Sequence, residues 1–276
     1  MRIRFAALLL LAASACSTPG SRQPPEAGPA PPLAQVALTE WQAWGGIVLE
    51  GWPEGRPADT AATPDRFDRL IGYWREVPGN EGVARRLETQ RASLRAALSG
   101  QGMAELAAAD TAALPAPTAP PVEDIGLYAY PAWSAAFVSA MARRAGIPES
   151  DLPSEAAHAF YIDALLWRAA ADPQGARFLP HDPAERTPRP GDLLCADRSA
   201  RPLEHWTMRL LETGRSRPMH CDVVVRTAPE VVEAVGGNVK DVVALRRLPA
   251  DSQGRVLPAP PGQARLLLLL AARREG

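Results

Sequence analysis

The sequence lacks several features that would identify a ligand class. Its 276 residues carry 30 basic and 31 acidic side chains, and the net charge of −1 predicts no basic surface for nucleic acid or for an anionic membrane. No group of His, Cys, Asp or Glu has metal-site spacing, and no glycine-rich loop indicates nucleotide binding. We therefore expect no nucleic-acid partner, no metal and no other cofactor.

Apolar runs long enough to cross a membrane are also missing. The longest, Phe5–Ala13, is about half of what a spanning helix needs, and the leucines at 266–270 form a shorter run. The first run is unsuited to remain as an anchor helix. The second predicts a buried last strand or helix.

The first residues have the layout of a secretory signal. Arg2 and Arg4 precede the apolar run, and small residues follow it directly before Cys16. This resembles the lipobox of bacterial lipoproteins, in which the cysteine is lipidated. We expect residues 1–16 to be a lipoprotein signal peptide, with an ordinary signal peptide cut nearby as the alternative. Ser17, rather than Asp, then favours the periplasmic face of the outer membrane.

Composition divides the rest of the chain. Residues 17–35 are rich in Pro, Gly, Ser and Ala, which predicts a stiff tether. Residues 36–276 are enough for one domain with a buried core. Within it, residues 77–121 are Ala- and Glu-rich and end in a Pro-rich linker, which predicts an insertion with its own helix. This insertion is also a candidate surface for a protein partner.

Apolar periodicity predicts helices first and strands later. Helical spacing marks a front block of helices, in which Gly100 and Gly102 are expected to break the third. After the turn at 188–191 the pattern changes to short strands joined by polar turns, typical of an α+β domain. The predicted helices cover 38–48, 67–74, 81–113, 134–145 and 154–171, and the predicted strands cover 192–196, 220–226, 231–235 and 242–246.

Four short motifs resemble those of one hydrolase class. The segment at 133–138, Trp-Ser-Ala-Ala-Phe-Val, resembles the Trp-Cys-Ala-Ala-Phe-Val of CHAP-type cell-wall hydrolases, relatives of NlpC-type endopeptidases. Pro-Gly-Asp at 190–192 resembles the turn before their first central strand, and His220 resembles their strand histidine. Gly-Gly-Asn at 236–238 is similar to a segment of one CHAP subgroup. The resemblance implies a papain-like fold, with a helical front packed on a small antiparallel sheet.

A second resemblance is closer. Trp-Ser-Ala-Ala-Phe, Gly-Asp-Leu-x-Cys, His-Cys-Asp and Gly-Gly-Asn-Val are similar to motifs of a bacterial family of unknown function, often found as lipoproteins. The similarity covers roughly residues 37–75 and 122–250. It implies a shared fold more than a particular activity.

The resemblance to papain-like enzymes assigns three catalytic positions. Ser134 occupies the place of the nucleophile at a helix start, His220 that of the base, and Asn238 that of the residue that orients the base. A serine hydroxyl is far less acidic than a thiol, so a helix dipole worth ~1 kcal/mol does not ionise it. Ser134 is therefore a catalytic serine, part of a degenerate site that only binds, or a simple helix N-cap.

Other residues near these motifs are candidates for binding or structural roles. Asp222 lies two residues beyond His220, on the same face of a strand, and is a candidate cleft residue. Trp133 and His158 are candidate substrate contacts, with packing as the alternative for both. Cys195 and Cys221 either form a cross-strand disulfide, as the expected periplasmic location allows, or remain two buried thiols.

Two classes of function remain open at this stage. The first is an envelope hydrolase or acyltransferase that uses Ser134 and His220 on an amide or ester, in peptidoglycan or an attached peptide. The second is a catalytically inactive lipoprotein that binds the cell wall or acts as a scaffold.

Overall fold

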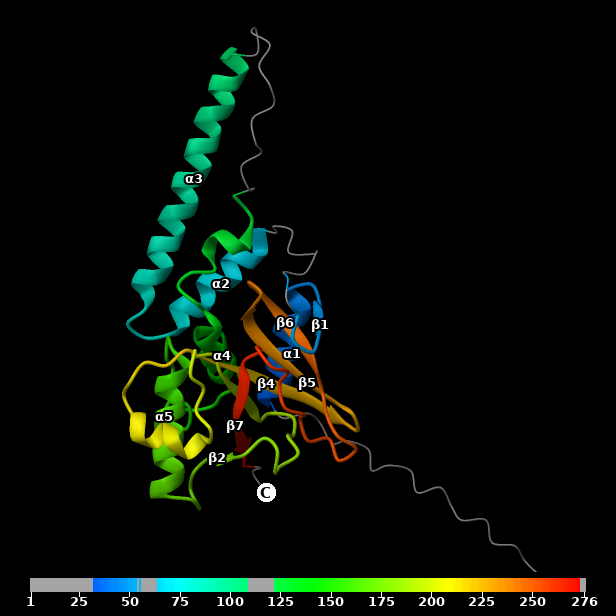
Figure 1. The fold of residues 1–276 in the computed structure, drawn as a ribbon. Coiled ribbons are helices and arrows are strands. Elements are labelled where there is room, and N and C mark those ends of the chain that lie inside the picture. Colours follow the sequence, from blue (N-terminus) through cyan, green and yellow to red (C-terminus); the bar gives the residue numbers. More distant parts are fainter. Residues whose placement is uncertain (1–31, 54, 56–63, 109–121, 274–276) are drawn as a thin grey trace, which may run out of the picture.

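The computed structural model describes residues 32–53, 55, 64–108 and 122–273, and these form an α+β structure (Figure 1). The predicted signal peptide and Cys16 lie outside the described residues. The α-helices are α1 (Pro32–Ala43), α2 (Pro64–Glu76), α3 (Glu81–Ala108), α4 (Ser134–Arg144) and α5 (His158–Ala171), and the 3-10 helices are η1 (Ile125–Tyr128) and η2 (Trp206–Glu212). The strands are β1 (Val48–Glu50), β2 (Phe178–His181), β3 (Leu193–Asp197), β4 (Met219–Ala228), β5 (Val231–Val239), β6 (Val242–Pro249) and β7 (Arg265–Ala272).

The strands described form one sheet in the order β1-β6-β5-β4-β3-β7-β2. Neighbouring strands are antiparallel except at one edge, where β1 runs parallel to β6. The sheet is therefore seven-stranded and mixed, larger than the small antiparallel sheet that was predicted and parallel at one edge. The missed strands β1 and β2 are short edge strands, and three or four residues carry too little periodicity to be recognised.

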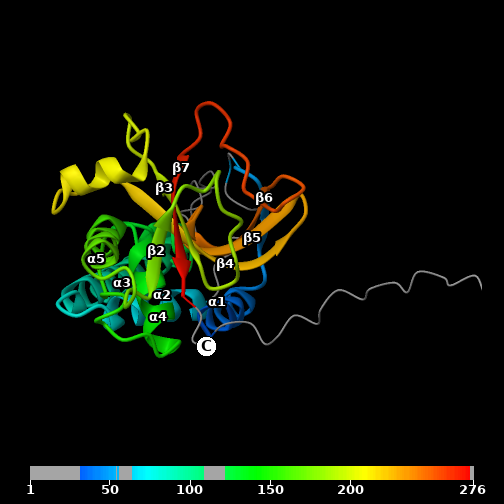
Figure 2. The ribbon, with the colours of Figure 1, turned by 90° about the horizontal axis from the view of Figure 1, so that it is seen from below.

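Helices cover one face of the sheet, and the two views in Figures 1 and 2 show them gathered to one side of the strands. Helices α1 and α4 both contact β4 and β5, and α5 lies against β2 and β4. The main core lies between them, and a smaller apolar cluster that includes Leu194, Val224 and Leu248 occupies the opposite face. Among the described residues, no helix has the length and hydropathy needed to span a membrane.

Two of the predicted helices differ from those observed. Helix α1 begins at Pro32, inside the predicted tether, and ends at Ala43, so that Val48 belongs to a strand rather than to the helix. Positive φ angles at Gly45 and Gly46 end the helix there. Helix α3 continues through Gly100 and Gly102 to Ala108, because a single glycine costs a helix only about 1 kcal/mol.

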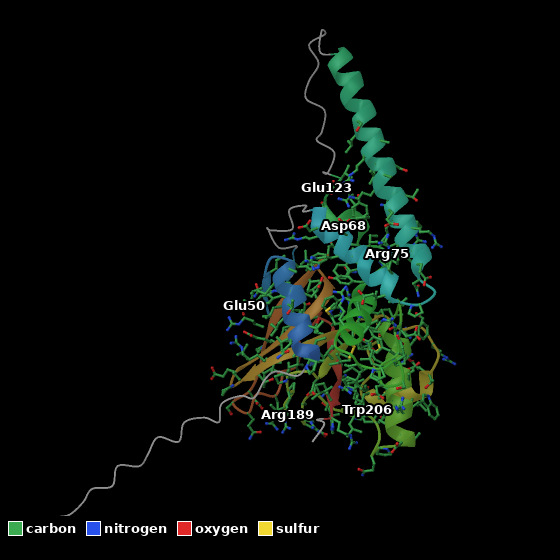
Figure 3. The ribbon with its side chains drawn as sticks, turned by 180° about the vertical axis from the view of Figure 1, so that it is seen from behind. Glu50, Asp68, Arg75, Glu123, Arg189 and Trp206 are labelled. Atoms are coloured by element: carbon green, nitrogen blue, oxygen red, sulfur yellow. A yellow bond between two sulfur atoms is a disulfide. The ribbon has the colours of Figure 1, made fainter. Side chains whose placement is uncertain are left out.

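Helix α3 projects from the body of the protein, and charged residues join its first half to the neighbouring segments (Figure 3). Arg75 of α2 pairs with Glu88 of α3 at 2.5 Å, and Arg95 of α3 pairs with Glu123 at 2.6 Å. The predicted helix within 77–121 is therefore present, and it packs on α2 only near its start.

Candidate functional site

Ser134 is the first residue of helix α4 and is only 5% exposed. Its hydroxyl oxygen lies 2.7 Å from Nε2 of His158. The N-cap residue of the helix is Trp133, which makes no side-chain capping bond. Ser134 is therefore not a simple N-cap, because its hydroxyl bonds to an imidazole from another helix.

His158 is the first residue of helix α5, and its second ring nitrogen is also bonded. Its Nδ1 lies 2.5 Å from the hydroxyl of Tyr161, one helical turn further along α5. Burial lowers the pKa of His158 well below its usual value, and the nearby His220 lowers it further. Burial also raises the pKa of Tyr161, with a further contribution from the charge of Asp222. Both side chains are consequently neutral near pH 7.

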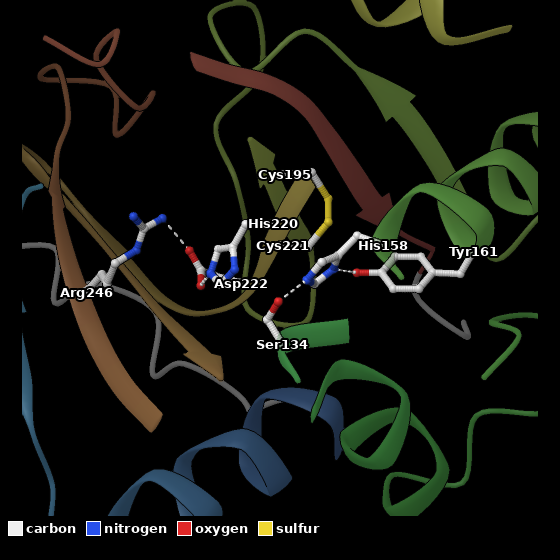
Figure 4. The surroundings of a disulfide bond; sticks show 8 residues. All are labelled: Ser134, His158, Tyr161, Cys195, His220, Cys221, Asp222 and Arg246. Atoms are coloured by element: carbon white, nitrogen blue, oxygen red, sulfur yellow. Dashed lines mark hydrogen bonds and ion pairs between the residues drawn. A yellow bond between two sulfur atoms is a disulfide. The ribbon is translucent and has the colours of Figure 1, made fainter. Parts of the chain in front are cut away.

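His220 lies near the start of β4 and is held by Asp222, as Figure 4 shows. Its Nε2 lies 2.8 Å from Oδ1 of Asp222, and Arg246 of β6 forms an ion pair with the other carboxylate oxygen. Burial alone would raise the pKa of Asp222. The charge of Arg246 and the bonds from His220 and Arg246 outweigh it, so the pKa lies below its usual value. Asp222 is therefore an ionised acceptor.

The two histidines bring these groups into one site. The rings of His158 and His220 contact each other with centroids 5.5 Å apart, so His220 lies one ring away from the Ser134 hydroxyl. The Ser134 hydroxyl therefore bonds to His158 and not to His220, the residue predicted to be its base. Nδ1 of His220 is buried and has no hydrogen-bond partner among the described residues. An unpaired nitrogen of this kind is uncommon in a folded protein.

Glycines on β5 make room for the site. A Cβ at Gly236 would lie 1.9 Å from the carboxylate of Asp222, and a Cβ at Gly237 would lie 2.4 Å from the side chain of Phe137 on α4. Strand β5 lies between β4 and β6, so the ion pair between Asp222 and Arg246 spans an intervening strand. Glycine at 236 leaves the space that this ion pair needs.

Asn238, predicted to orient the base, does not contact His220. Its amide nitrogen donates to the carbonyl of Ala129 over 3.4 Å, while Asp222 holds the histidine ring. The backbone φ of Asn238 is +55°, in the left-handed region that asparagine tolerates better than most residues. The structure thus places Asn238 near the end of β5, where the register with β6 is irregular, rather than in the hydrogen-bond chain of the site.

The two cysteines lie beside the site. Cys195 of β3 and Cys221 of β4 face each other in the strand register and form a disulfide (Figure 4). Side chains alternate along a strand, so Cys221 points away from the face shared by its neighbours His220 and Asp222. The disulfide therefore ties together the two central strands at the level of the site without entering it.

The aspartate of the Pro-Gly-Asp motif has a structural position. Asp192 accepts bonds at 2.8 Å from the backbone N–H groups of Arg189 and Ala272. Burial raises the pKa of Asp192 to about 6, although these backbone bonds act in the opposite direction. Asp192 joins the turn before β3 to the end of β7.

Trp133, a candidate substrate contact, lies in the core. It is fully buried and stacks on Trp44 and Tyr73, with ring centroids 5.3 and 5.7 Å away. The stack fixes the residue that precedes Ser134. Trp133 therefore has no exposed surface with which to line a cleft.

Trp44 and Tyr73 of this stack also belong to a second polar group, which surrounds the buried carboxylate of Glu40. It is here called the Glu40 cluster and consists of Glu40, Trp44, Arg69, Tyr73 and Arg144. Tyr73 donates to Glu40 over 2.5 Å and accepts a bond from Trp44 over 2.7 Å. Arg69 and Arg144 bind the same carboxylate at 3.2 and 2.9 Å. Sequence reasoning missed this cluster because its members are 104 residues apart at the extreme.

Tyr161 and Arg246 are the residues of the site that sequence reasoning missed. Tyr161 had a usable signal, since positions three apart on a helix share a face. Arg246 had none, because its partner lies two strands away in the sheet. Among the described residues, no group of three or more His, Cys, Asp or Glu is arranged to hold a metal ion. The site contains the hydroxyl of Ser134 and the imidazole rings of His158 and His220, with the ionised carboxylate of Asp222 beside the second ring.

Comparison with protein families identifies the group to which the chain belongs. Residues 69–265 match the family DUF2272, described as an uncharacterized protein conserved in bacteria, and this span is more than half of the chain. The chain is a member of this family. The match includes all of residues 77–121, the segment predicted to be an insertion. No curated protein and no solved structure shows significant similarity to the chain.

Proposed function

We propose that this DUF2272 protein is an envelope-anchored hydrolase or acyltransferase that uses Ser134 as the nucleophile on an amide or ester. One observation carries the proposal. The hydrogen-bonded chain Arg246–Asp222–His220 ends on a buried, unpaired ring nitrogen one ring away from the Ser134 hydroxyl.

The charge on Asp222 decides which nitrogen of His220 carries the proton. An ionised carboxylate only accepts hydrogen bonds, so Nε2 of His220 must be the N–H donor in this contact. In the neutral ring, Nδ1 then holds an unshared electron pair. A positioned imidazole with a free lone pair is what a general base requires.

The reaction follows from this arrangement. The Ser134 oxygen attacks the carbonyl carbon while its proton passes to Nδ1 of His220, and the resulting imidazolium is stabilised by Asp222. His220 then gives that proton to the leaving amine or alcohol, whose bond to the carbonyl carbon breaks and leaves an acyl group on Ser134. Water then attacks the acyl group on Ser134 by the same steps in reverse, which completes hydrolysis. Attack by another nucleophile in place of water gives acyl transfer. The His220 ring must move toward the Ser134 oxygen to close the remaining distance, as happens when catalytic bonds tighten on substrate binding.

The start of helix α4 supplies the complementary charge stabilisation. The first N–H groups of a helix have no partner within it, and they carry the positive end of the helix dipole. Because Ser134 is the first residue of α4, these donors lie next to the carbonyl oxygen that would become negative during the attack.

A papain-like arrangement of the CHAP and NlpC type is part of the proposal. It is supported by a nucleophile at the start of a helix packed against a sheet, and by a histidine on a central strand of that sheet. Asp222 would take the orienting role that the motif comparison gave to Asn238.

Placement in the cell envelope is also proposed, with a lipid on Cys16 at the periplasmic face of the outer membrane and peptidoglycan or an attached peptide as substrate. The disulfide between Cys195 and Cys221 supports a compartment outside the reducing cytosol. Mass spectrometry of the mature N-terminus from membranes tests the anchor. A diacylglyceryl-modified Cys16 is expected, and an unmodified N-terminus at another residue would contradict it.

A second candidate function is a wall-binding or scaffold lipoprotein with no catalysis. It is favoured by Ser134 itself, which is only 5% exposed and whose hydroxyl is already bonded to His158. The projecting helix α3 supports a scaffold role through residues 77–121. Binding of purified protein to sacculi, unchanged by Ser134→Ala in the absence of any turnover, would favour this function.

A fluorophosphonate probe separates the two functions without knowledge of the substrate. We expect the probe to label Ser134, as located by peptide mass spectrometry, and we expect Ser134→Ala and His220→Gln each to abolish the label. Ser139→Ala is the matched control, because Ser139 lies on the same helix, is buried, and bonds the backbone of Glu155 instead of a histidine. Turnover of muropeptides and small esters by the wild type alone would then identify the bond. No label on the wild type together with no turnover would overturn the proposal.

A further inference from the structure

The proposed nucleophile is bonded to a histidine that the reaction above does not use. His158 lies 2.7 Å from the Ser134 oxygen, closer than the proposed base His220, and Tyr161 is bonded to its far side. The direction of these two hydrogen bonds determines what His158 can do. If Nε2 accepts from Ser134, His158 is a base, and if Nε2 donates, it is not.

The hydroxyl of Tyr161 sets the direction. Tyr161 is completely buried, and its one hydrogen bond among the described residues joins it to Nδ1 of His158. A buried phenol retains its proton and must donate it to avoid the cost of an unpaired polar hydrogen, about 1–3 kcal/mol. The acceptor available to it in this contact is Nδ1 of His158, so that nitrogen carries no hydrogen.

The proton of His158 is then on Nε2. Burial keeps the ring neutral, so it carries a single N–H, and with Nδ1 accepting from Tyr161 that N–H must point at Ser134. The Ser134 oxygen consequently accepts a bond, and its own hydrogen is free to be donated elsewhere. The unpaired nitrogen of His220 is the acceptor on the other side of the site.

We propose that Tyr161 and His158 form a donor pair that holds the Ser134 oxygen, with Tyr161 positioning His158 and His158 donating to the reacting atom. The inference deepens the proposed function and rests on Ser134 being the nucleophile. It gives the two histidines opposite tasks: His220 receives the proton of Ser134, and His158 stabilises the negative charge that grows on the oxygen as the proton leaves. A fixed donor of this kind lowers the cost of removing the proton from a hydroxyl, which is less acidic than the thiol found at this position in the CHAP-type enzymes that the motif resembles.

The protonated nitrogen can be observed directly. Long-range proton–nitrogen NMR spectra of nitrogen-15-labelled protein distinguish the ring tautomers, and the chain has only four histidines to assign. We expect neutral His158 with its hydrogen on Nε2 at pH 7, and loss of that preference in Tyr161→Phe. Tyr128→Phe is the matched control, because Tyr128 is another buried tyrosine, and it bonds a backbone carbonyl. A hydrogen on Nδ1 of His158, or a charged ring at pH 7, would overturn the donor pair whether or not the protein is an enzyme.

The kinetics of fluorophosphonate labelling provide a second, independent test of whether His158 acts as a donor or as a base. Glutamine at 158 retains an N–H donor but is no base, whereas leucine provides neither. We expect His158→Gln to label Ser134 within about threefold of the wild-type rate and His158→Leu to label it roughly 10–10²-fold more slowly, the effect of losing one charge-assisted hydrogen bond. Near-UV circular dichroism checks that each variant is folded, and if His158→Leu is not, Tyr161→Phe takes its place with an expected loss of about tenfold. Equal loss in the glutamine and leucine variants would show a base and overturn the donor pair. If no protein is labelled at all, the proposed function fails while the NMR result still decides the tautomer.

Discussion

The two ends of helix α4 carry two buried polar groups that differ in one respect. Ser134 at the start contacts His158, and Arg144 at the end binds Glu40. In the Glu40 cluster, the carboxylate and the phenol hydroxyl are each paired with neighbouring side chains. At the other end, Nδ1 of His220 has no hydrogen-bond partner among the described residues.

This difference separates a structural group from a functional one. An unpaired buried nitrogen costs about 1–3 kcal/mol, and a fold that closes the Glu40 cluster completely could close the second group as well. Five other buried side-chain atoms among the described residues also lack a partner, but they are Trp and Arg nitrogens, which only donate. Nδ1 of His220 is the one of the six that can accept a proton from another group. Variants at the two ends of α4 should accordingly affect different properties.

The largest effect is expected from Asp222→Asn. The new amide donates to Nε2 of His220 and moves the ring proton to Nδ1, so the base is lost. In the serine-protease triad the equivalent change lowers kcat by about 10⁴-fold. We expect a loss of that order in the rate of fluorophosphonate labelling of Ser134, measured by mass spectrometry over time.

Asp163→Asn is the control for this variant. Asp163 is also buried and pairs with a buried arginine, Arg209, at 2.7 Å, but it contacts neither histidine. It should lower the free energy of unfolding while leaving labelling of the folded protein within a few-fold of wild type. Labelling of Asp222→Asn as rapid as that of the wild type would contradict a catalytic role for the group at the start of α4.

The next largest effect is expected from Glu40→Ala, in the Glu40 cluster at the C-terminal end of α4. Removing one partner of a buried ion pair costs about 3–5 kcal/mol. Arg69 and Arg144 have side chains 38% and 33% exposed, so water can solvate them, and we expect the lower end of that range, about 3 kcal/mol. Urea denaturation measures the loss, and labelling of Ser134 below the unfolding transition should be retained. A loss of labelling in protein that is still folded would mean that the Glu40 cluster serves the site through the Trp133 stack.

The smallest effect is expected from pH and concerns His158. Because burial lowers its pKa in the folded protein, the unfolded chain binds a proton that the folded chain does not, and stability must fall as the pH drops below about 6.5. The slope is at most about 1.4 kcal/mol per pH unit for one group. Asp192, with its pKa raised to about 6, acts in the opposite sense below that pH. Urea denaturation at pH 7.5 and 5 should therefore show a smaller acid loss for His158→Gln than for wild type, and equal losses would show that His158 is charged when folded.

Much of the fold could be predicted because its central elements are long and periodic. The predicted segments for α4, α5 and β3 to β6 correspond to observed elements, since alternation and helical spacing are local properties of the sequence. The short strands β1 and β2 could not be predicted, because they exist only through pairing with β6 and β7. Helix α1 was misplaced by several residues at each end, and the break expected at Gly100 and Gly102 of α3 is not observed.

The site was predictable in its candidate residues and not in their contacts. Motif order pointed to Ser134 and His220, and strand alternation placed Asp222 beside His220. The contact between Ser134 and His158 joins the starts of two helices, and the loop between those helices determines it rather than any periodicity. Contacts of this kind depend on tertiary packing, which single-sequence patterns do not contain.

Strand β7 has a practical consequence for work on this family. The family match ends at residue 265, where β7 begins, and starts at residue 69, after α1 and β1. A fragment cut at those limits would lose an interior strand that separates β3 from β2, together with Glu40 and Trp44. Expression of the folding unit should therefore begin before Pro32 and extend through Ala272, so that the fragment contains every strand of the sheet described here.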